Sequence, residues 1–469
     1  MSKIFSFKKF IKKQPVLFYS VIFFLFISIL ILSFFLWSST YKDFSKVKPL
    51  TPEQNKSLQV FLDQTYPLNR GNSLKPLPYP IVEANLDISA ESAILIDASN
   101  GCILFEKNAN KLIPPASITK LFVMYVVFKE IEAGNITLDD LVQPPEISWA
   151  INMPSDSSLM FLGQGHNVTL RELLLGLAIA SGNDAAIAVA NYISGNVKNF
   201  VSRMNYEVKA LGLKNTHFEE PSGYSEKNIT TARELAEFCR IYINKFPESL
   251  TEFHSKNEIR YPLEKNLPFW QKSKGDTLAV YQRNTNPLLN VLDGCDGLKT
   301  GFIYESGYNL SLTCKRGDSR YISVTMKGPG IGSKQGNFYR KKDGTTLMEW
   351  AFSSFSTYDP SKKTKQTFTI PALGCKGKFI NLVPAWNSTI TVPHIKGETS
   401  QIDANSVVAE ISIPKFVYGG TKLGNIYGQI QYKLDGTILE TVPLIADREL
   451  PRASIWGRFW GTLASFRFK

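Results

Sequence analysis

Three short motifs, widely separated along the 469-residue chain, constrain its fold more than any other feature. They are Ser117-Ile118-Thr119-Lys120, Ser181-Gly182-Asn183 and Lys299-Thr300-Gly301. Each motif alone is common enough to occur by accident. All three in this order, each in a suitable local structure, indicate one serine-based active site. The fold must then bring together a helix start, a tight turn and a strand edge.

Ser117 and Lys120 have the spacing of a nucleophile and its base. Ser117 lies at the predicted start of an apolar helix that runs to about Ala133, where the helix dipole favours developing negative charge. Lys120 is one turn further on, on the same face. Burial beside other cations can lower the pKa of a lysine, so that neutral Lys120 could take the serine proton. An ordinary helix cap is the alternative for Ser117.

The turn at Ser181-Gly182-Asn183 lies between two predicted helices. Ser181 could relay a proton, and Asn183 could hold the amide of a substrate. The backbone N–H groups of Ser117 and Phe302 could form an oxyanion hole for the acyl-transfer intermediate.

The third motif is predicted on a strand joined to its neighbour by a turn that contains Gly307. Lys299 and Thr300 could bind a terminal carboxylate, and Gly301 would let the substrate backbone approach closely. An exposed strand cation is the alternative for Lys299.

Metal-dependent and Ser-His-Asp chemistry find little support. The histidines are scattered, no His-Glu-x-x-His motif occurs, and the cysteines form no Cys-x-x-Cys pair. No cofactor is implied. The net charge of +12 is consistent with a solvated surface with basic ends, or with attraction to an anionic membrane or cell-wall polymer. No nucleic-acid-binding signature accompanies it.

Cys295 and Cys314 flank the predicted turn near Gly307 at nearly mirrored positions, in a register that also pairs Lys299 with Leu310. An exported protein could bond them. Two buried free thiols are the favoured alternative, and a Cα separation above about 7 Å would exclude the bond.

The N-terminus carries five lysines within its first thirteen residues, followed by an uncharged run from about Pro15 to Thr40. This run is long enough to cross a bilayer as a helix, and the lysines should keep its start cytoplasmic. We therefore expect residues 1–40 to be a basic tail and transmembrane anchor, with the rest of the chain on the extracytoplasmic side. A cleavable signal peptide is the alternative.

Residues 452–469 should form an amphipathic membrane helix. Large apolar residues recur on one face, and basic residues surround them, as in helices that lie in a membrane interface. A terminal helix docked on the protein's own core is the alternative. The apolar face consists of Ile455, Trp456, Phe459, Trp460, Leu463 and Phe466.

Between the ends we expect three segments. Residues 41–87 are rich in proline and predict a stalk. Residues 88–355 contain the motifs together with predicted strands and helices. Residues 360–447 show short alternating strands separated by Gly, Pro and Asn, which predicts a small all-β domain.

The chain resembles the low-molecular-mass D-alanyl-D-alanine carboxypeptidases, the serine peptidase family that includes penicillin-binding protein 5, from about Ile88 to Lys469. The shared segments are Pro115-Ala-Ser-Ile-Thr-Lys120, Ser181-Gly-Asn-Asp-Ala185, Met204-Asn205, Leu211-Gly212-Leu213, Thr216-His-Phe218, Thr231-Ala-Arg233, Asp296-Gly-Leu-Lys-Thr-Gly301 and Gly307-Tyr-Asn-Leu310.

This resemblance implies a β-lactamase-like α/β serine transpeptidase domain followed by the small all-β domain. It also implies Ser117 as acylated nucleophile, Lys120 as proton acceptor, and Arg340 near the carboxylate site. The expected reaction removes the terminal D-alanine from peptidoglycan pentapeptide stems, and β-lactam antibiotics would inhibit it.

Two features depart from the family pattern. The N-terminal anchor is long where the family has a cleaved signal, and Phe122-Val123 stand where the family more often has Met-Thr. A D,D-endopeptidase, a β-lactamase of the same fold and an inactive wall-binding scaffold remain as alternatives. Intact motifs argue against the scaffold.

Overall fold

The computed structural model describes residues 15–39, 41, 47–81, 84–387, 389–394, 406–466 and 468. The chain divides into two compact units. The larger comprises Gly71–Pro360 and Ser388–Val407, and the smaller comprises Met1–Arg70, Ser361–Asn387 and Val408–Lys469.

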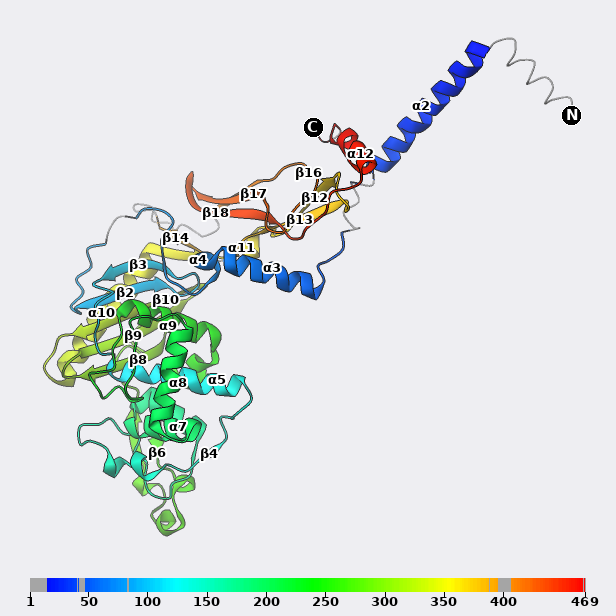
Figure 1. The fold of residues 1–469 in the computed structure, drawn as a ribbon. Helices are drawn as coiled ribbons and strands as arrows, with labels where there is room; N and C mark the ends of the chain where they lie inside the picture. Colours follow the sequence, from blue (N-terminus) through cyan, green and yellow to red (C-terminus); the bar gives the residue numbers. More distant parts are fainter. Residues whose placement is uncertain are drawn as a thin grey trace. The chain divides into compact units, whose positions relative to one another are not determined.

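The larger unit is built on a six-stranded sheet in the order β1-β3-β2-β10-β9-β8 (Figure 1). All neighbouring strands are antiparallel except β1 and β3. Strand β8 carries the third motif and lies at the edge of the sheet. The strands are β1 (Lys75–Pro76), β2 (Ser92–Asp97), β3 (Cys102–Lys107), β8 (Cys295–Ile303), β9 (Gly307–Arg316) and β10 (Ser319–Gly328).

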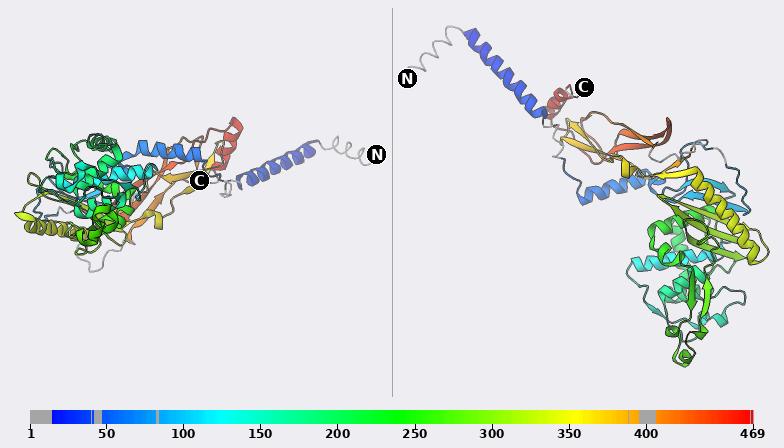
Figure 2. Two further views of the ribbon diagram at one scale, coloured as in Figure 1. Left: turned by 90° about the horizontal axis from the view of Figure 1, so that it is seen from below. Right: turned by 180° about the vertical axis from the view of Figure 1, so that it is seen from behind.

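Strand β2 is buried on both faces, because helices cover both sides of the sheet. Ala93 and Leu95 pack in one apolar cluster with residues of α10 (Gly332–Ser354). Ile94 and Ile96 point the other way, into a cluster with α5 (Lys120–Glu132) and α9 (Ala232–Lys245). Figure 2 shows α10 lying along the sheet in the view from behind. The two-sided burial explains why this strand is a continuous apolar run.

Helix α5 forms the centre of the larger core. Every residue from Leu121 to Phe128 is buried. Its neighbours in the same apolar cluster include residues of α6 (Leu170–Leu175), α7 (Asn183–Ser194) and α8 (Val197–Ala210). A helix that is apolar all round has to be buried on all sides, which fixes the turn before it, Ala116–Thr119 with Ser117, at a defined place in the fold.

Shorter elements complete the larger unit. Strand β14 (Ile390–Pro393) pairs with β11 (Phe355–Tyr358) in this unit. The sequence analysis placed that strand in the all-β domain, since alternation alone does not reveal a strand's partner. The others are β4 (Leu141–Val142), β5 (Val168–Thr169), β6 (Glu258–Tyr261) and β7 (Val280–Arg283).

The smaller unit contains a second six-stranded sheet, in the order β15-β17-β18-β13-β12-β16. Its central strands bury one face, as the alternating sequence predicted. The strands are β12 (Phe368–Leu373), β13 (Phe379–Pro384), β15 (Val408–Ser412), β16 (Val417–Tyr418), β17 (Ile426–Leu434) and β18 (Thr437–Ala446). Two short helices, α4 (Pro67–Arg70) and α11 (Pro360–Lys363), lie at the boundaries of the units.

The segment predicted to be a stalk contains a folded helix, α3 (Pro52–Thr65), so the stalk interpretation is wrong for these residues. Pro52 occupies the first turn, where its missing N–H costs nothing. Thr51 caps the helix, since its hydroxyl accepts from Gln54 N at 3.2 Å and its own N–H donates to the Gln54 side chain at 3.0 Å. Leu58 and Leu62 are buried within the smaller unit.

Both predicted terminal helices are present. Helix α2 (Pro15–Ser39) is, in the described part of the chain, the one helix long and apolar enough to cross a membrane. The lysines expected before it lie outside the described residues. Helix α12 (Ile455–Ser465) follows the second sheet.

Candidate active site

The segment before α5 forms a tight 3₁₀ turn, Ala116–Thr119, that exposes Ser117 in part and buries its neighbours. Ala116 has a φ of 51°, an uncommon value for a residue with a side chain. Such strain persists only where the surroundings impose it, and it recurs at active sites.

Two glycines impose this turn by letting other segments approach its backbone. A Cβ on Gly223 would come within 1.9 Å of the Ala116 carbonyl oxygen. A Cβ on Gly301 would come within 2.6 Å of the Pro115 carbonyl oxygen and 3.1 Å of Ser117 N. Gly301 was expected to make room for the substrate. The structure assigns the space to the enzyme's own backbone.

Lys120 is buried beneath Ser117. Its Nζ lies 2.8 Å from Ser117 Oγ and 2.8 Å from Asn183 Oδ1, and it also contacts the carbonyl oxygen of Ser222. The side chain is wholly shielded from solvent. Burial lowers the pKa of Lys120 to about 7, because removing an ammonium from water favours the neutral amine. The first two motifs therefore meet at one nitrogen atom.

Two carboxylates moderate this shift from a distance. Glu220 and Asp184 both act to raise the pKa of Lys120, although burial has the larger effect. Glu220 accepts hydrogen bonds from Ser222 N at 2.7 Å and Gly223 N at 2.6 Å, and so fixes the loop whose carbonyl contacts Lys120. Sequence reasoning missed Glu220 and Ser222, because no motif surrounds them.

The middle motif forms the turn between α6 and α7. Ser181 has a φ of 60°, and Asn183 is the first residue of α7. The N–H of Asn183 donates to Ser158 O at 2.8 Å. The buried carboxylate of Asp184 accepts from Met160 N at 2.8 Å, which ties the adjoining loop to this turn. The turn is thus anchored on both sides, and it holds Asn183 Oδ1 at the Lys120 amine.

The third motif places a second buried lysine near the first. Lys299 is 1% exposed, and its Nζ donates to Thr300 O at 3.2 Å. Burial lowers the pKa of Lys299 well below its usual value, and the charges of Lys120 and Arg340 lower it further. Thr300 Oγ1 donates to Thr285 Oγ1 at 2.8 Å. This corner of the site has excess positive charge.

Arg340 projects from α10 into the same region. Its Nε donates to Asn309 O at 3.0 Å, its Nη1 donates to Asn337 Oδ1 at 2.9 Å, and its Nη2 donates to Gly301 O. Burial lowers the pKa of Arg340 to about 10. The guanidinium therefore braces β8 and β9 from behind while contributing charge to the site.

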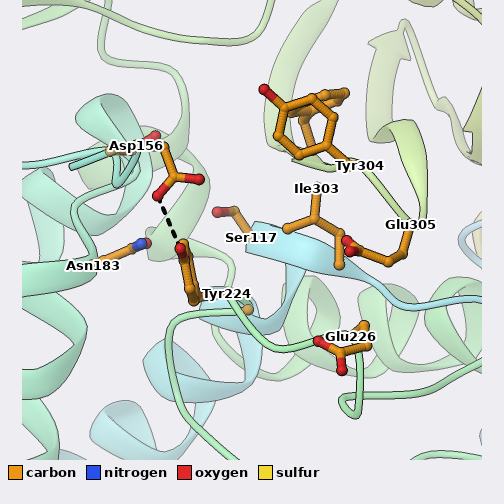
Figure 3. A pocket seen from close by; sticks show the side chains of 11 residues that line it. Ser117, Asp156, Asn183, Tyr224, Glu226, Ile303, Tyr304 and Glu305 are labelled. Carbon is orange, nitrogen blue, oxygen red and sulfur yellow. Dashed lines mark hydrogen bonds between the residues drawn. The ribbon is translucent and has the colours of Figure 1, made fainter. Parts of the chain in front are cut away.

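Six of the predicted residues line a cavity of about 770 Å³, whereas the buried Lys120 and Lys299 do not. Ser117, Ser181, Thr300, Gly301, Phe302 and Arg340 line it. A second hollow of about 260 Å³ shares Ser117 and Phe302 and continues past Asn183. In Figure 3, Asp156 and Tyr224, joined by a hydrogen bond of 2.8 Å, lie on one side of Ser117, and Tyr304 and Glu305 lie on the other.

The departure at Phe122 does not reach this cavity. Phe122 is 1% exposed, and its ring stacks on Phe238 with centroids 3.5 Å apart. It belongs to the core of the larger unit. The histidines are dispersed as well, and within the described ranges no three His, Cys, Asp or Glu side chains gather as metal ligands would.

The sequence matches the D-alanyl-D-alanine carboxypeptidase family over residues 80–330, more than half of the chain. Residues 355–452 match the C-terminal domain of penicillin-binding protein 5. The chain belongs to the D-alanyl-D-alanine carboxypeptidase family. It is a serine-type D-Ala-D-Ala carboxypeptidase and a penicillin-binding protein, as the sequence analysis predicted.

Individual relatives agree. The chain is 32% identical to D-alanyl-D-alanine carboxypeptidase DacF of Bacillus subtilis, over 78% of this chain and 86% of that protein. It is 32% identical to carboxypeptidase DacA of Escherichia coli K12, over 79% and 86%. The crystal structure of penicillin-binding protein 5 from Haemophilus influenzae superposes with a TM-score of 0.65 at 29% identity, covering 80% of this chain and all of that one. The predicted β-lactamase-like domain with its β domain is confirmed.

The state of Lys120 predicts how acylation depends on pH. With a pKa near 7, Lys120 is the neutral amine above that pH and the ammonium below it. Penicillin acylation should therefore rise with pH through about 7 and fall about tenfold per unit below it. Stopped-flow acylation rates between pH 5 and 9 measure this.

Glu220→Gln identifies the titrating group. Losing its negative charge should lower the pKa of Lys120 and move the midpoint to lower pH. Glu219→Gln, at the exposed neighbouring position, should leave the midpoint unchanged. If both variants kept the wild-type midpoint, another group would control the rate.

Proposed function

We propose that Ser117 is the residue acylated by the penultimate D-alanine of a pentapeptide stem. Ser117 Oγ attacks the carbonyl carbon of the terminal peptide bond, and Lys120 accepts the hydroxyl proton. The C–N bond breaks, and the proton passes to the departing D-alanine. A water molecule then hydrolyses the ester and frees Ser117. The contact of 2.8 Å between Lys120 Nζ and Ser117 Oγ, away from solvent, is the observation that supports this assignment best.

The remaining motif residues have complementary roles in this proposal. The backbone N–H groups of Ser117 and Phe302 stabilise the oxyanion. Asn183 orients the stem amide beside Lys120, and Ser181 returns the proton to the leaving amine. Both side chains are nearly buried and adjoin the cavity that contains Ser117, which supports these roles.

Lys299, Thr300 and Arg340 form the proposed site for the terminal carboxylate. Three observations support it: two buried cations, the Thr300 hydroxyl on the cavity wall, and a lowered pKa of Lys299 that a bound anion would raise again. A neutral C-terminus would leave these charges uncompensated. The site therefore favours an exopeptidase over an endopeptidase, whose substrate continues past the cleaved bond.

We further propose that the enzyme acts on the extracytoplasmic face of a membrane. Helix α2 is long and apolar enough for an anchor or signal, and most of its described side chains are exposed. Peptidoglycan stems lie on that side of the membrane, so the proposed location of the enzyme matches the location of its proposed substrate.

Helix α12 has two different faces. Gly461 and Ala464 are buried, and a Cβ on Gly461 would come within 2.5 Å of Gly374 N. Trp456 and Phe459 on another side are 73% and 51% exposed. Small residues thus dock the helix on its own unit while the aromatic side remains available. We propose that this side inserts into the membrane interface, with Arg458 adding attraction to anionic lipid.

The nucleophile is tested by mass spectrometry of the penicillin-treated protein. The adduct should lie on the peptide that contains Ser117, and Ser117→Ala should neither bind penicillin nor release D-alanine from a D-Ala-D-Ala peptide. Ser158→Ala, which alters another hydroxyl beside the same cavity, should still be labelled. Labelling of Ser117→Ala at another residue would refute the assignment. Rapid penicillin turnover would favour a β-lactamase.

The carboxylate site is tested at Lys299. Lys299→Ala should weaken transition-state binding by about 2–5 kcal/mol, because it removes one partner of a desolvated ion pair. Lys315 is an exposed cation on the neighbouring strand. Lys315→Ala should change the free energy of transition-state binding, measured from kcat/KM, by less than about 0.5 kcal/mol. Amidating the substrate carboxylate should lower kcat/KM of the wild type far more than it lowers kcat/KM of Lys299→Ala. Equal losses of kcat/KM in the two proteins would contradict the proposed role of Lys299.

The aromatic side of α12 is tested with a chain lacking residues 1–40, which should sediment with anionic liposomes. Trp456→Glu with Phe459→Glu should release it, because both side chains become charged. Phe269→Glu with Trp270→Glu, at comparably exposed positions of the larger unit, should not. A truncated chain that stays in the supernatant would show that α12 is only a docked element.

A further inference from the structure

The hairpin that carries Lys299 also carries two cysteines. Cys295 is the first residue of β8, and Cys314 lies near the end of β9. The two are direct partners in the antiparallel ladder. The segment between them contains all of Lys299-Thr300-Gly301 and the connecting turn. A bond between them would enclose the whole motif.

Cys295 and Cys314 lie opposite each other, as their mirrored positions in the sequence predicted, although the predicted partner of Lys299 is wrong. Lys299 pairs with Ser311 and not with Leu310, so the ladder is displaced by one residue at the motif. A bulge between Cys295 and Gly297 takes up this residue and brings Cys295 opposite Cys314. The bulge is what makes the two cysteines partners.

Their pairing in the ladder is compatible with a disulfide. Direct partners in an antiparallel pair have Cα atoms about 4.5–5.5 Å apart, within the range of about 4.4–6.8 Å found across disulfides. The Cys314 side chain is the largest cause of the lowered pKa of the Cys295 thiol, which agrees with their opposite positions in the ladder. The structure has both residues as free thiols.

The two thiols differ in access and in acidity. Cys295 is partly exposed, whereas Cys314 is fully buried. The hydrogen bond from Cys314 lowers the pKa of the Cys295 thiol, and the same contact together with burial raises the pKa of Cys314. The thiolate is the reactive form, so Cys295 is the entry point and Cys314 the resolving thiol.

We propose that Cys295 and Cys314 form a reversible disulfide, by exchange with an external disulfide oxidant, that closes the hairpin bearing the carboxylate-binding motif. The Cys295 thiolate attacks one sulfur of the oxidant and releases the first thiol. The Cys314 sulfur, on losing its proton, then attacks Cys295 Sγ and releases the second. The two cysteines lose two hydrogens in total, and the oxidant gains them.

The position of the bond gives it a consequence for the site. Strand β8 is an edge strand, held by hydrogen bonds to β9 alone within its sheet. Near Cys295 the ladder is interrupted by the bulge, and the side chain of Asp296 is held by Arg320 at 2.7 and 2.8 Å. A covalent link here would fix the register of Lys299 and Thr300 where backbone pairing is weakest. No other two cysteines are strand partners in the described part of the chain.

The test uses the full-length protein in detergent, reduced and then treated with oxidised glutathione. After alkylation of remaining thiols, peptide mass spectrometry should find Cys295 linked to Cys314. Cys295→Ala should leave Cys314 as a free thiol, because the entry point is lost. Cys375→Ala, which removes the other partly exposed cysteine, should leave the link unchanged. Penicillin labelling of each variant verifies its folding, since neither residue adjoins the site.

Thermal unfolding supplies the second readout. Closing the hairpin should raise the Tm of the larger unit by on the order of 5 °C, and Cys295→Ala should show no such rise. A glutathione adduct that stays on Cys295, a link to another cysteine, or a Cys295–Cys314 link without a rise in Tm would each overturn the proposal. The inference rests on the exported location proposed above, but these measurements require no catalysis, so they fail independently of the proposed function.

Discussion

Burial of the Lys120 amine beside Ser117 is the interaction on which the rest of the site depends. Its Nζ has three oxygen neighbours, none of them a carboxylate. A carboxylate in direct contact would hold the ammonium and remove the base. Glu220 instead accepts hydrogen bonds from backbone amides of the loop that approaches Lys120. Its charge therefore raises the pKa of Lys120 without direct contact with the amine. The pKa of Lys120 is near 7 because burial lowers it more than these distant carboxylates raise it.

Water is excluded from the Lys120 amine because three chain segments pack over it with no side chains between them. Gly223 and Gly301 make that possible, since each lies against the backbone of the turn that carries Ser117. The same closeness holds Ala116 at a positive φ and aims Ser117 at the cavity. The geometry of catalysis is therefore maintained by packing of main chain on main chain, supported by a helix, α5, that has no exposed face over most of its length.

The sequence predicted the convergence of the motifs because each has a local signal: a helix start, a turn, and a strand. It did not predict Glu220 or Ser222, whose roles arise from a long-range approach of backbone. It predicted the wrong partner for Lys299, since a bulge leaves little trace in a sequence. It also missed α3, because prolines that suggested a stalk include one at a helix start, and the capping residues Thr51 and Gln54 went unnoticed. The motifs with a local sequence signal could be predicted, whereas contacts and strand register between distant segments could not.

Lys299 of the third motif is the cation most affected by its neighbours. It is buried, and the charges of Lys120 and Arg340 lower its pKa further. Arg340 directs its donors to carbonyl and amide oxygens of the protein, so it supplies rigidity and field more than a free hydrogen-bonding group. Lys299, whose one described hydrogen bond goes to a neighbouring carbonyl, has donors left for a ligand. In the proposed carboxylate site, a stem that ends in a carboxylate would supply negative charge beside Lys299, whereas a stem without one would leave this buried cation uncompensated. The same burial that lowers the pKa of Lys120 would thus favour, at Lys299, a substrate that brings its own negative charge.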